Sequence, residues 1–350
     1  MGVFALGIEL DGEGFHPHAW RRAAHAPDRL LSGATVRDRV ATAENAGFTL
    51  ATFADSILPP EQIVGRIDAV NRASFVAATT STIGLVPAVA TTYAEPFHTA
   101  SQVATLDYAS RGRAGWIAER SDDPRAAATW GRTQVSGDAD LTAEQHDGIE
   151  VARRLWDSWE DDAVVRDYRS GRFLDRNKLH YIDFRGATYS VKGPAIVPRP
   201  PQGQPVVFGV DGEVDVQLIA ADSVAAAIEG AHRARAAGTA LAFAEIDVTL
   251  DTPAATAADR FGAAPSNSPA RLAFSGSATD LVDLLTHLSA HLDGVRLHPA
   301  VIDEDLPVLA REVLPALLRS GVAHRPVPGS TLRANLGLPR PANRYTSSQN

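Results

Sequence analysis

The chain has 350 residues, a net charge of −9 and no cysteine, which excludes thiol nucleophiles, thiolate metal sites and disulfides. Its hydrophobic fraction of 45% and charged fraction of 21% are those of a folded globular protein and exclude a disordered chain. The 42 acidic residues outnumber the 33 basic ones, so no nucleic-acid partner is expected.

The first residues, MGVFALGIELDGEG, lack a basic stretch, and Glu9 and Asp11 interrupt their short apolar run. They therefore make a poor signal peptide. The sequence contains no window of 18 apolar residues, so we expect no membrane span and a cytoplasmic protein.

Short apolar runs alternate with segments of helical period through the first half of the chain. The pattern predicts strands over residues 3–10, 49–54, 83–90 and 113–118. It predicts helices over residues 35–46, 67–80, 94–109 and 141–159. Gly47 follows the first helix and provides a C-cap signal.

The alternation pauses over residues 160–203, which are rich in charge, glycine and proline and contain a candidate hairpin at 181–189. It then resumes. The predicted strands span residues 205–210, 223–228, 240–250 and 294–298. The predicted helices span residues 214–221, 230–237, 279–292 and 306–319.

Eight alternating units imply parallel strands with right-handed crossovers, so we predict an α/β fold, a (β/α)8 TIM barrel. An open doubly wound sheet is the alternative, but Gly12 and Gly14 lack the third glycine of a dinucleotide-binding fingerprint. We expect one barrel over residues 1–325, including the insertion 160–203, and an extended C-terminal tail over residues 326–350.

Several strings of the chain resemble the bacterial luciferase-like flavin-dependent monooxygenases, in the branch that acts on nitrilotriacetate, alkanes and sulfur compounds. They occur in the family's order and span nearly the whole chain. The strings are FADS (53–56), TIGLVPAVATTYAEPF (82–97), ATLDYASRGRAGW (104–116), LWDSWEDDA (155–163), VKGPAIVPRPPQGQPVV (191–207) and GSTLRANLGLPRP (329–341).

The resemblance implies a barrel that binds flavin at the carboxyl ends of its strands and oxygenates a small organic substrate with O2. It implies reduced FMN as the cofactor, with a deazaflavin coenzyme as the alternative, and a nicotinamide or a separate flavin reductase as the source of electrons. It further implies a homodimer or homotetramer. A catalytically silent barrel, or a subunit of an active homologue, is the competing hypothesis.

Three residues at the ends of the second and third strands are cofactor candidates by this resemblance. Asp55 follows a strand, where a carboxylate can accept a hydrogen bond from a bound ring or simply close a loop. Thr91 and Thr92 end the third strand, where the family has a hydroxyl pair under the flavin. Taken alone, threonine at this position also fits ordinary strand propensity.

Trp116 and Ile117 end the fourth strand and are also cofactor candidates. The tryptophan can wall a planar ligand or fill the core. The family usually has asparagine after it, whereas Ile117 cannot donate a side-chain hydrogen bond. A second departure falls at Leu141 and Thr142, which stand where the family has an Arg-Tyr pair.

Gly209 and Gly212 are the candidates for holding a phosphate. Their backbone N–H groups precede a short predicted helix, an arrangement that binds anions, although a plain turn is equally compatible. The family's turn here is Ala-Gly-x-Ser, and Asp211 of this chain would repel a phosphate. The departures leave three options: FMN held differently, a deazaflavin, or lost catalysis.

His16 and His18 follow the first strand and are the catalytic candidates, because an imidazole beside a flavin can take up or release a proton. Their H-x-H spacing also suits a metal, but no second ligand cluster accompanies it, so no metal site is expected. His298 ends the last strand on the reactive face, and His180 lies in the insertion.

Trp156 and Trp159 lie three residues apart on one helical face. Core packing is the favoured interpretation, and an aromatic pocket wall is the alternative. Ser277 or Thr279 reads as the N-cap of the helix that follows, rather than as a nucleophile.

Overall fold

The computed structural model describes residues 4–58, 65–261 and 271–346, in which parallel strands close into a barrel. Val3, the expected start of the first strand, and the last four residues of the tail lie outside this range. The barrel strands are β1 (Ala5–Glu9), β2 (Leu50–Phe53), β3 (Gly84–Ala90), β4 (Gly115–Glu119), β9 (Val206–Gly209), β10 (Val216–Ile219), β11 (Leu241–Leu250) and β13 (Gly294–Pro299).

Closure follows from the strand pairing. Neighbours run in the order β10-β9-β4-β3-β2-β1-β13-β11, and β10 also pairs with β11, so the sheet has no open end among these eight strands. A further strand, β12 (Leu272–Gly276), pairs with β11 outside the ring. The predicted (β/α)8 barrel is therefore confirmed, and the doubly wound sheet is excluded.

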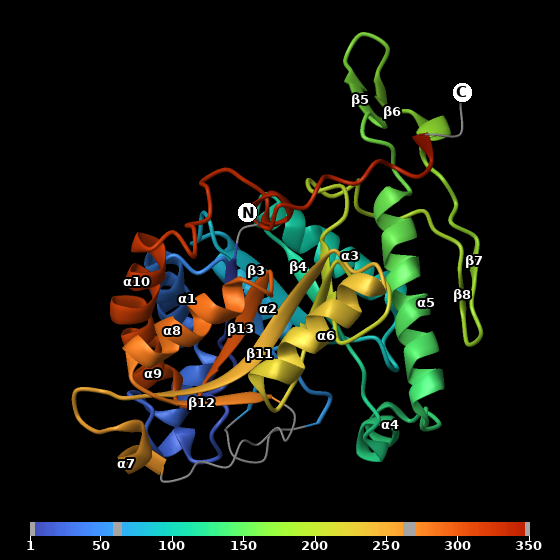
Figure 1. The fold of residues 1–350 in the computed structure, drawn as a ribbon. Helices are drawn as coiled ribbons and strands as arrows, with labels where there is room; N and C mark the ends of the chain where they lie inside the picture. The colour runs from blue at the N-terminus through green and yellow to red at the C-terminus, as the bar shows by residue number, and fades with distance from the viewer. Residues whose placement is uncertain (1–3, 59–64, 262–270, 347–350) are drawn as a thin grey trace.

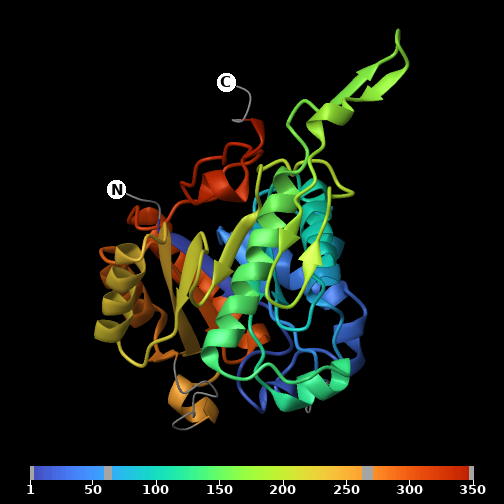
Figure 2. The same cartoon turned by 90° about the vertical axis from the view of Figure 1, so that its right-hand side faces the viewer.

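Helices surround the barrel on its outside (Figures 1 and 2). They are α1 (Ala34–Ala46), α2 (Ala69–Ala77), α3 (Pro96–Ala109), α4 (Pro124–Trp130), α5 (Asp138–Asp157), α6 (Val224–Ala236), α7 (Ala257–Phe261), α8 (Ala278–Ser289), α9 (Ile302–Val308), α10 (Leu314–Arg319) and α11 (Leu332–Asn335). Two predicted ends are confirmed: α1 stops at Gly47 with φ of 105°, and Ser277 caps α8 by accepting from the N–H of Asp280.

The sixth unit of the barrel differs from the prediction. Residues 216–219 form strand β10 rather than a helix, and residues 224–228 belong to helix α6 rather than to a strand. Val216 and Leu218 point into the barrel, where burial decides their conformation, and Ser223 caps the alanine-rich helix. The number of strands is unchanged, but no helix lies in the described residues between β9 and β10, and the predicted strand 223–228 and helix 230–237 form the single helix α6.

The insertion holds two small antiparallel pairs. β7 (Phe184–Arg185) pairs with β8 (Ser190–Val191), slightly beyond the predicted hairpin at 181–189. β5 (Val164–Asp167) pairs with β6 (Arg172–Leu174) in a hairpin that extends away from the barrel (Figure 2).

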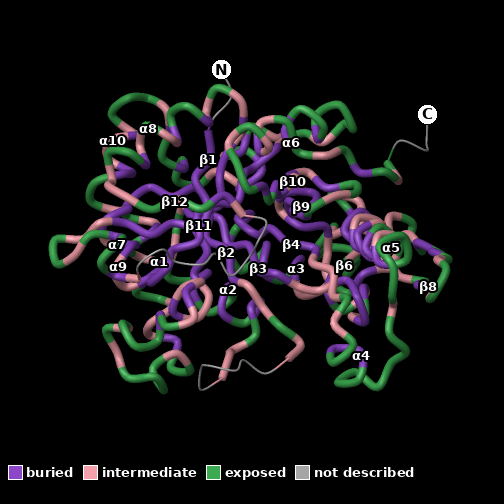
Figure 3. The backbone as a smooth tube through the Cα atoms, turned by 60° about the horizontal axis from the view of Figure 1, so that its bottom comes forward, coloured by how far each residue is buried: buried purple, intermediate pink, exposed green. Residues whose placement is uncertain are grey.

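Each barrel strand alternates between the lumen and the helix layer. Figure 3 shows the strands as the most buried part of the chain. On β4, Ile117 joins the apolar cluster of the lumen, whereas Trp116 joins the cluster under α3 and α5. Trp156 belongs to the same outer cluster, and its indole donates to the carbonyl of Ala100 at 3.0 Å. Trp159 packs against that cluster, so both tryptophans of the LWDSW string are packing residues.

Helix α11, from the GSTLRANLGLPRP string, lies at the amino-terminal end of the lumen. Leu332 is fully buried there in the apolar lumen cluster. A Cβ placed on Gly84 would lie 2.6 Å from Leu332 Cδ1, so this close approach requires glycine. The tail therefore closes the end of the barrel opposite the carboxyl ends of the strands. Within the described ranges, no helix is long and apolar enough to cross a membrane.

Candidate functional site

A cavity of about 370 Å³ opens at the carboxyl ends of β2, β3 and β4, the end where barrels bind their ligands. Ala88, Val89 and Ala90 of β3 line it, together with the loops after β2 and β4 and Trp130 of α4. Its volume is that of a small-molecule site. Another hollow, of about 600 Å³, lies between α3 and the insertion, and its described lining residues come from outside the barrel strands.

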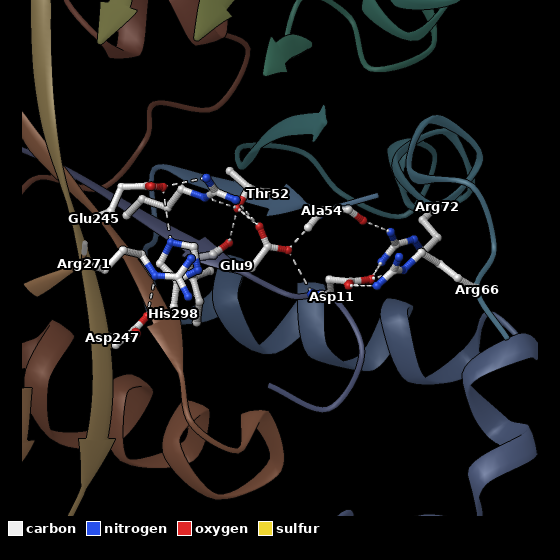
Figure 4. Close-up of polar contacts among 12 residues, drawn as sticks. Glu9, Asp11, Thr52, Ala54, Arg66, Arg72, Glu245, Asp247, Arg271 and His298 are labelled. Atoms are coloured by element: carbon white, nitrogen blue, oxygen red, sulfur yellow. Dashed lines mark hydrogen bonds and ion pairs between the residues drawn. The ribbon is translucent and has the colours of Figure 1, made fainter. Parts of the chain in front are cut away.

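Arg296 of β13 lies at the centre of a buried polar network in the lumen. Its Nη2 donates to Glu9 of β1 at 2.5 Å, and its Nη1 donates to Glu245 of β11 at 2.7 Å. Its Nε donates to Thr52 of β2 at 3.0 Å, and His298 Nε2 lies 3.3 Å from Glu245 (Figure 4). One guanidinium thus joins four barrel strands.

The charges in this network are set by burial and by Arg296. Burial opposes the ionisation of Glu9, but the electrostatic attraction of Arg296 and of the His298 ring, together with the hydrogen bonds from Arg296 and Thr52, outweighs burial and lowers the pKa of Glu9 to about 2. The same balance lowers the pKa of Glu245. Burial, with the repulsion of Arg296, lowers the pKa of His298. At pH 7 two carboxylates therefore face one guanidinium and a neutral imidazole.

The network continues into the loops after β1 and β2. Glu9 Oε1 accepts hydrogen bonds from the N–H groups of Ala54 at 2.9 Å and Asp11 at 3.0 Å. The Asp11 carboxylate pairs with Arg66 and Arg72, each at 2.7 Å (Figure 4). These contacts hold the two loops against the strand ends beside the cavity.

Glu119 ends β4 and is a third carboxylate near Arg296. It follows Ile117 of the lumen by two residues, and it also lines the cavity. Its carboxylate makes no hydrogen bond or ion pair with the described residues. Burial raises the pKa of Glu119 to about 7; attraction by Arg296 opposes this, and repulsion by Glu9, Glu245 and Asp55 adds to it.

Two predicted cofactor residues line the cavity. Asp55 accepts from the N–H of Ser56 at 2.8 Å and from the N–H of Ala69, the first residue of α2, at 2.7 Å. Thr92 is fully buried, and its hydroxyl accepts from the N–H of Ser121 at 3.0 Å. Asp55 therefore binds the first N–H group of α2, whose N-cap is Asp68, and borders the cavity at the same time.

Five predicted cofactor residues do not line the cavity: Thr91, Trp116 and Ile117, and the two glycines Gly209 and Gly212. The Thr91 hydroxyl donates to the backbone carbonyl of Glu119 at 2.9 Å. Trp116 faces the helix layer, where its indole donates to the Val89 carbonyl at 3.0 Å and lies edge-on to Trp156. Ile117 is buried in the lumen.

Gly209 and Gly212 border a buried polar site on α5. Gln145 of α5 donates to the Ala118 carbonyl at 2.6 Å, while its Oε1 is buried and has no partner within the described chain. A Cβ on Gly212 would lie 3.9 Å from this oxygen, and Gly212 has a φ of +83°. The glycine loop thus leaves space beside an acceptor that lacks a donor.

Arg120 connects this polar site to the cavity. It lines the cavity and pairs with Asp211 at 3.2 Å, and its Nη1 donates to Thr142 at 2.6 Å. Asp211 Oδ1 is also buried without a partner in the described chain. The acid expected to repel a phosphate is therefore neutralised by a neighbouring guanidinium.

His16 and His18 do not line this cavity. His16 is buried and stacks on Phe261 of α7, with 3.8 Å between ring centroids, and its Nδ1 accepts from the N–H of His18 at 3.1 Å. Burial lowers the pKa of His16, so its ring is neutral at pH 7. His18 is exposed. The structure places both in the loop after β1, at the same end of the barrel as the cavity.

The cluster of Glu13, His25 and Asp303 has the composition of a metal site. Arg39 already occupies its centre, because the guanidinium donates to Glu13 at 2.6 Å and to Asp303 at 2.9 Å and lies 3.2 Å from His25. An internal cation therefore supplies the positive charge that these acids require.

The sequence interpretation missed Glu119, Glu9, Glu245 and Arg296 as site residues. Each is a charged residue two positions after an apolar or glycine lumen residue of a strand, as Glu119 follows Ile117 and Arg296 follows Gly294. That alternation was the available signal.

Comparisons with known proteins identify relatives of this chain. The chain is 35% identical over 227 residues to N-acetyl-S-(2-succino)cysteine monooxygenase of Bacillus subtilis, in a match that covers 62% of this chain and 50% of that protein. It is 32% identical to one of the subunits of pristinamycin IIA synthase of Streptomyces pristinaespiralis, over 89% of this chain and 91% of that one. The chain spans about half the length of the first of these relatives.

Among solved structures, long-chain alkane monooxygenase superposes with a TM-score of 0.82 at 19% identity, over 96% of both chains, which shows a shared fold. The family model described as luciferase-like monooxygenase matches residues 15–274. The expected resemblance is therefore confirmed, and the chain belongs to the luciferase-like monooxygenase family.

Proposed function

We propose that this protein is a flavin-dependent monooxygenase that uses reduced FMN and O2 to oxygenate a small organic molecule. The observation that carries the proposal is the cavity at the carboxyl ends of β2 to β4, in a barrel of this family. Bound flavin supplies the redox chemistry with O2, and the protein supplies orientation and exclusion of water.

The described residues fit a flavin in two respects. Ala88, Val89 and Ala90 offer an apolar surface to a planar ring, and Trp130 adds an aromatic one. The unpartnered oxygen of Gln145 would accept a hydrogen bond from a hydroxyl of a ribityl chain. These features support both FMN and a deazaflavin, which share that chain.

The described residues offer fewer contacts to the phosphate group of FMN. Arg120 is the one cation among the described residues that line the cavity, and it is engaged with Asp211. A phosphate would have to share Arg120 with that carboxylate, or use the backbone N–H groups of Gly209 and Gly212. The helix predicted after these glycines is absent from the described residues 214–221, because strand β10 follows them, so no helix N-terminus assists the binding of an anion there. A modest affinity for FMN follows, as expected of a protein that takes flavin already reduced from a separate reductase.

The predicted site residues keep proposed roles of different kinds. Asp55, Thr92, Gly209 and Gly212 would contact the flavin directly. Thr91 would act indirectly, by holding the backbone carbonyl of Glu119. Trp116 and Ile117 would support strand β4, to which Glu119 belongs. His16 and His18 remain proposed proton carriers in the adjacent loop.

A second candidate is a chain that works only in complex with a longer homologue. The relative that matches over nearly its full length is named as one subunit of a synthase, and another subunit of the same synthase is also 32% identical to this chain, over 57% of it. Together with the apolar Ile117, this favours a pairing between unlike luciferase-like chains as an alternative to the expected homodimer or homotetramer. Sedimentation of the purified chain, alone and mixed with a longer luciferase-like homologue, separates these assemblies.

The deciding experiment is an anaerobic titration of the protein with FMN, reduced FMN and a reduced deazaflavin, followed by calorimetry. We expect reduced FMN to bind most tightly and Ala90→Trp, which fills the cavity, to lower its affinity at least tenfold. Ala290→Trp, on an exposed residue after α8, is the matched control and should bind as the wild type does. Failure of every flavin to bind at high micromolar concentration would overturn the proposal.

A further inference from the structure

We propose that Glu119 keeps its proton from acidic pH up to neutrality and, in this neutral form, donates a hydrogen bond, and on demand its proton, to the molecule bound in the cavity. The donor role rests on the proposed function, whereas the protonation of Glu119 does not. The inference starts from the geometry of the carboxylates around Arg296.

Each nitrogen of the Arg296 guanidinium already donates to another residue. Its three donor nitrogens bond to Glu9, Glu245 and Thr52 at 2.5 to 3.0 Å. Both carboxylates that it holds are buried, with whole-residue exposures of 8% each. The described structure contains no ion pair or hydrogen bond between this guanidinium and the third carboxylate of the lumen, although the positive charge of Arg296 still acts on it.

Glu119 is that third carboxylate, and it faces other negative groups on several elements. Glu9 approaches from β1, Asp55 from the loop after β2 and Glu245 from β11. Arg296 and His298 of β13 supply one charge and a neutral ring, respectively. Arg120, which follows Glu119 directly after β4, pairs with Asp211 and donates a hydrogen bond to Thr142. Ionising Glu119 would thus add a negative charge to those of Glu9, Glu245 and Asp55, which binding of a proton avoids.

The backbone of Glu119 is fixed while its side chain is not. Its carbonyl accepts from both the N–H and the hydroxyl of Thr91, at 2.8 and 2.9 Å. The carboxyl group, by contrast, lines the cavity without a partner among the described residues. A held strand end that presents a free acid to a cavity suits proton donation, because the donor is aimed and is not consumed by an internal bond.

The proposed step is a proton transfer only. The Oε–H bond of Glu119 breaks and an O–H or N–H bond forms on the bound molecule, so Glu119 becomes a carboxylate and the acceptor gains one positive charge. Water that enters with product release returns a proton to the carboxylate. No electron changes hands on this residue.

The first arm of the test needs no ligand. Infrared difference spectra of the flavin-free protein between pH 5.5 and 8.5 should contain a carboxylic C=O band that disappears with a midpoint near 7. Glu119→Gln should remove that band, and the exposed Glu229→Gln should leave it unchanged. Burial also raises the pKa of Asp107 to about 6, so this carboxyl group contributes a second band in the same pH range. Asp107→Asn removes that second band and so distinguishes it from the band of Glu119. A band unchanged in Glu119→Gln would overturn the protonated acid.

The second arm uses riboflavin, which carries no phosphate to titrate in this range. We expect the wild-type affinity to fall about tenfold from pH 6 to 8.5, equivalent to about 1.4 kcal/mol. Glu119→Gln keeps an N–H donor and should show no pH dependence, while Glu119→Ala should bind several-fold more weakly at both pH values.

The two arms separate the possible failures. Riboflavin binding that is equal in wild type and Glu119→Ala, and independent of pH, would overturn the donor role. Absence of binding to every variant would overturn the proposed function and with it the donor role, while the infrared band would still decide whether Glu119 is protonated.

Discussion

Arg199 and Asp157 form a buried ion pair that joins two strings by which the family resemblance is made. Arg199 Nε, from the PRPPQG segment, donates to Asp157 Oδ1 of LWDSW at 3.1 Å, and the two side chains are 2% and 1% exposed. Gln204 donates to the other Asp157 oxygen at 2.7 Å, and Asn343 of the tail donates to the Asp157 carbonyl. These strings are therefore structural, and they attach α5, the insertion and the tail to one another.

Removing one member of this pair is expected to destabilise the fold strongly. Asp157→Ala leaves the Arg199 guanidinium buried with only the half-exposed Asp161 as its acidic partner, at a cost of about 3 kcal/mol. Urea denaturation measures the change. Glu229→Ala breaks an exposed pair with Arg233 and should cost no more than about 0.5 kcal/mol. Similar losses for both variants would contradict the importance of the buried pair.

Replacing Arg296 by methionine should destabilise the protein by about 3–5 kcal/mol at pH 8, because Glu9 and Glu245 would be left as buried, unpaired carboxylates. Protonation relieves that repulsion, so the loss should shrink at pH 5. Arg37→Met, at an exposed pair with Asp38, provides the control. Denaturation midpoints at the two pH values check the prediction, and a loss independent of pH would contradict it.

The pH dependence of stability should carry a contribution from Glu119 of definite sign. Its pKa rises from 4.5 to about 7 on folding, so the native state holds an extra proton between these values. The stabilisation is complete below pH 4.5 and is lost as the pH rises through 7, by at most about 3 kcal/mol since the side chain is partly exposed in the cavity. Glu119→Gln should therefore become more stable relative to wild type from pH 5 to pH 8, as urea titrations would reveal.

Leu332→Ala should lower stability by about 2–5 kcal/mol, because it empties the closed end of the lumen beneath Gly84 and Gly115. Flavin affinity, measured by calorimetry, should stay within about twofold of wild type, since the cavity lies at the other end of the strands. A large loss of flavin affinity with intact folding would show that the two ends of the barrel are coupled.

The sequence predicted most of the barrel because each strand except one carries a local signature. The apolar runs at 83–90 and 240–250 fall within one residue of β3 and β11. The exception is the region around Val216 and Ser223, where two short elements of similar composition are adjacent. There, burial in the lumen decides the outcome, and burial is not a local property.

The candidate site was predicted less completely, for a related reason. Asp55 and Thr92 could be placed because a strand end points to the reactive face. Trp116 and Ile117 were predicted at the same face. In the structure Trp116 faces the helix layer, and Ile117 faces the lumen below the cavity. Arg296, Glu9 and Glu245 are brought together only by closure of the ring, which no local pattern contains.

The position of α11 has a consequence for biosynthesis. The lumen residues Val86, Ile117 and Phe243 share their apolar cluster with Leu332, which leaves the ribosome long after the strands that surround it. Until that leucine has emerged, a nascent chain with all eight strands assembled would still expose apolar surface at the amino-terminal end of its barrel. Docking of Leu332 therefore has to follow assembly of the strands before the apolar lumen is covered.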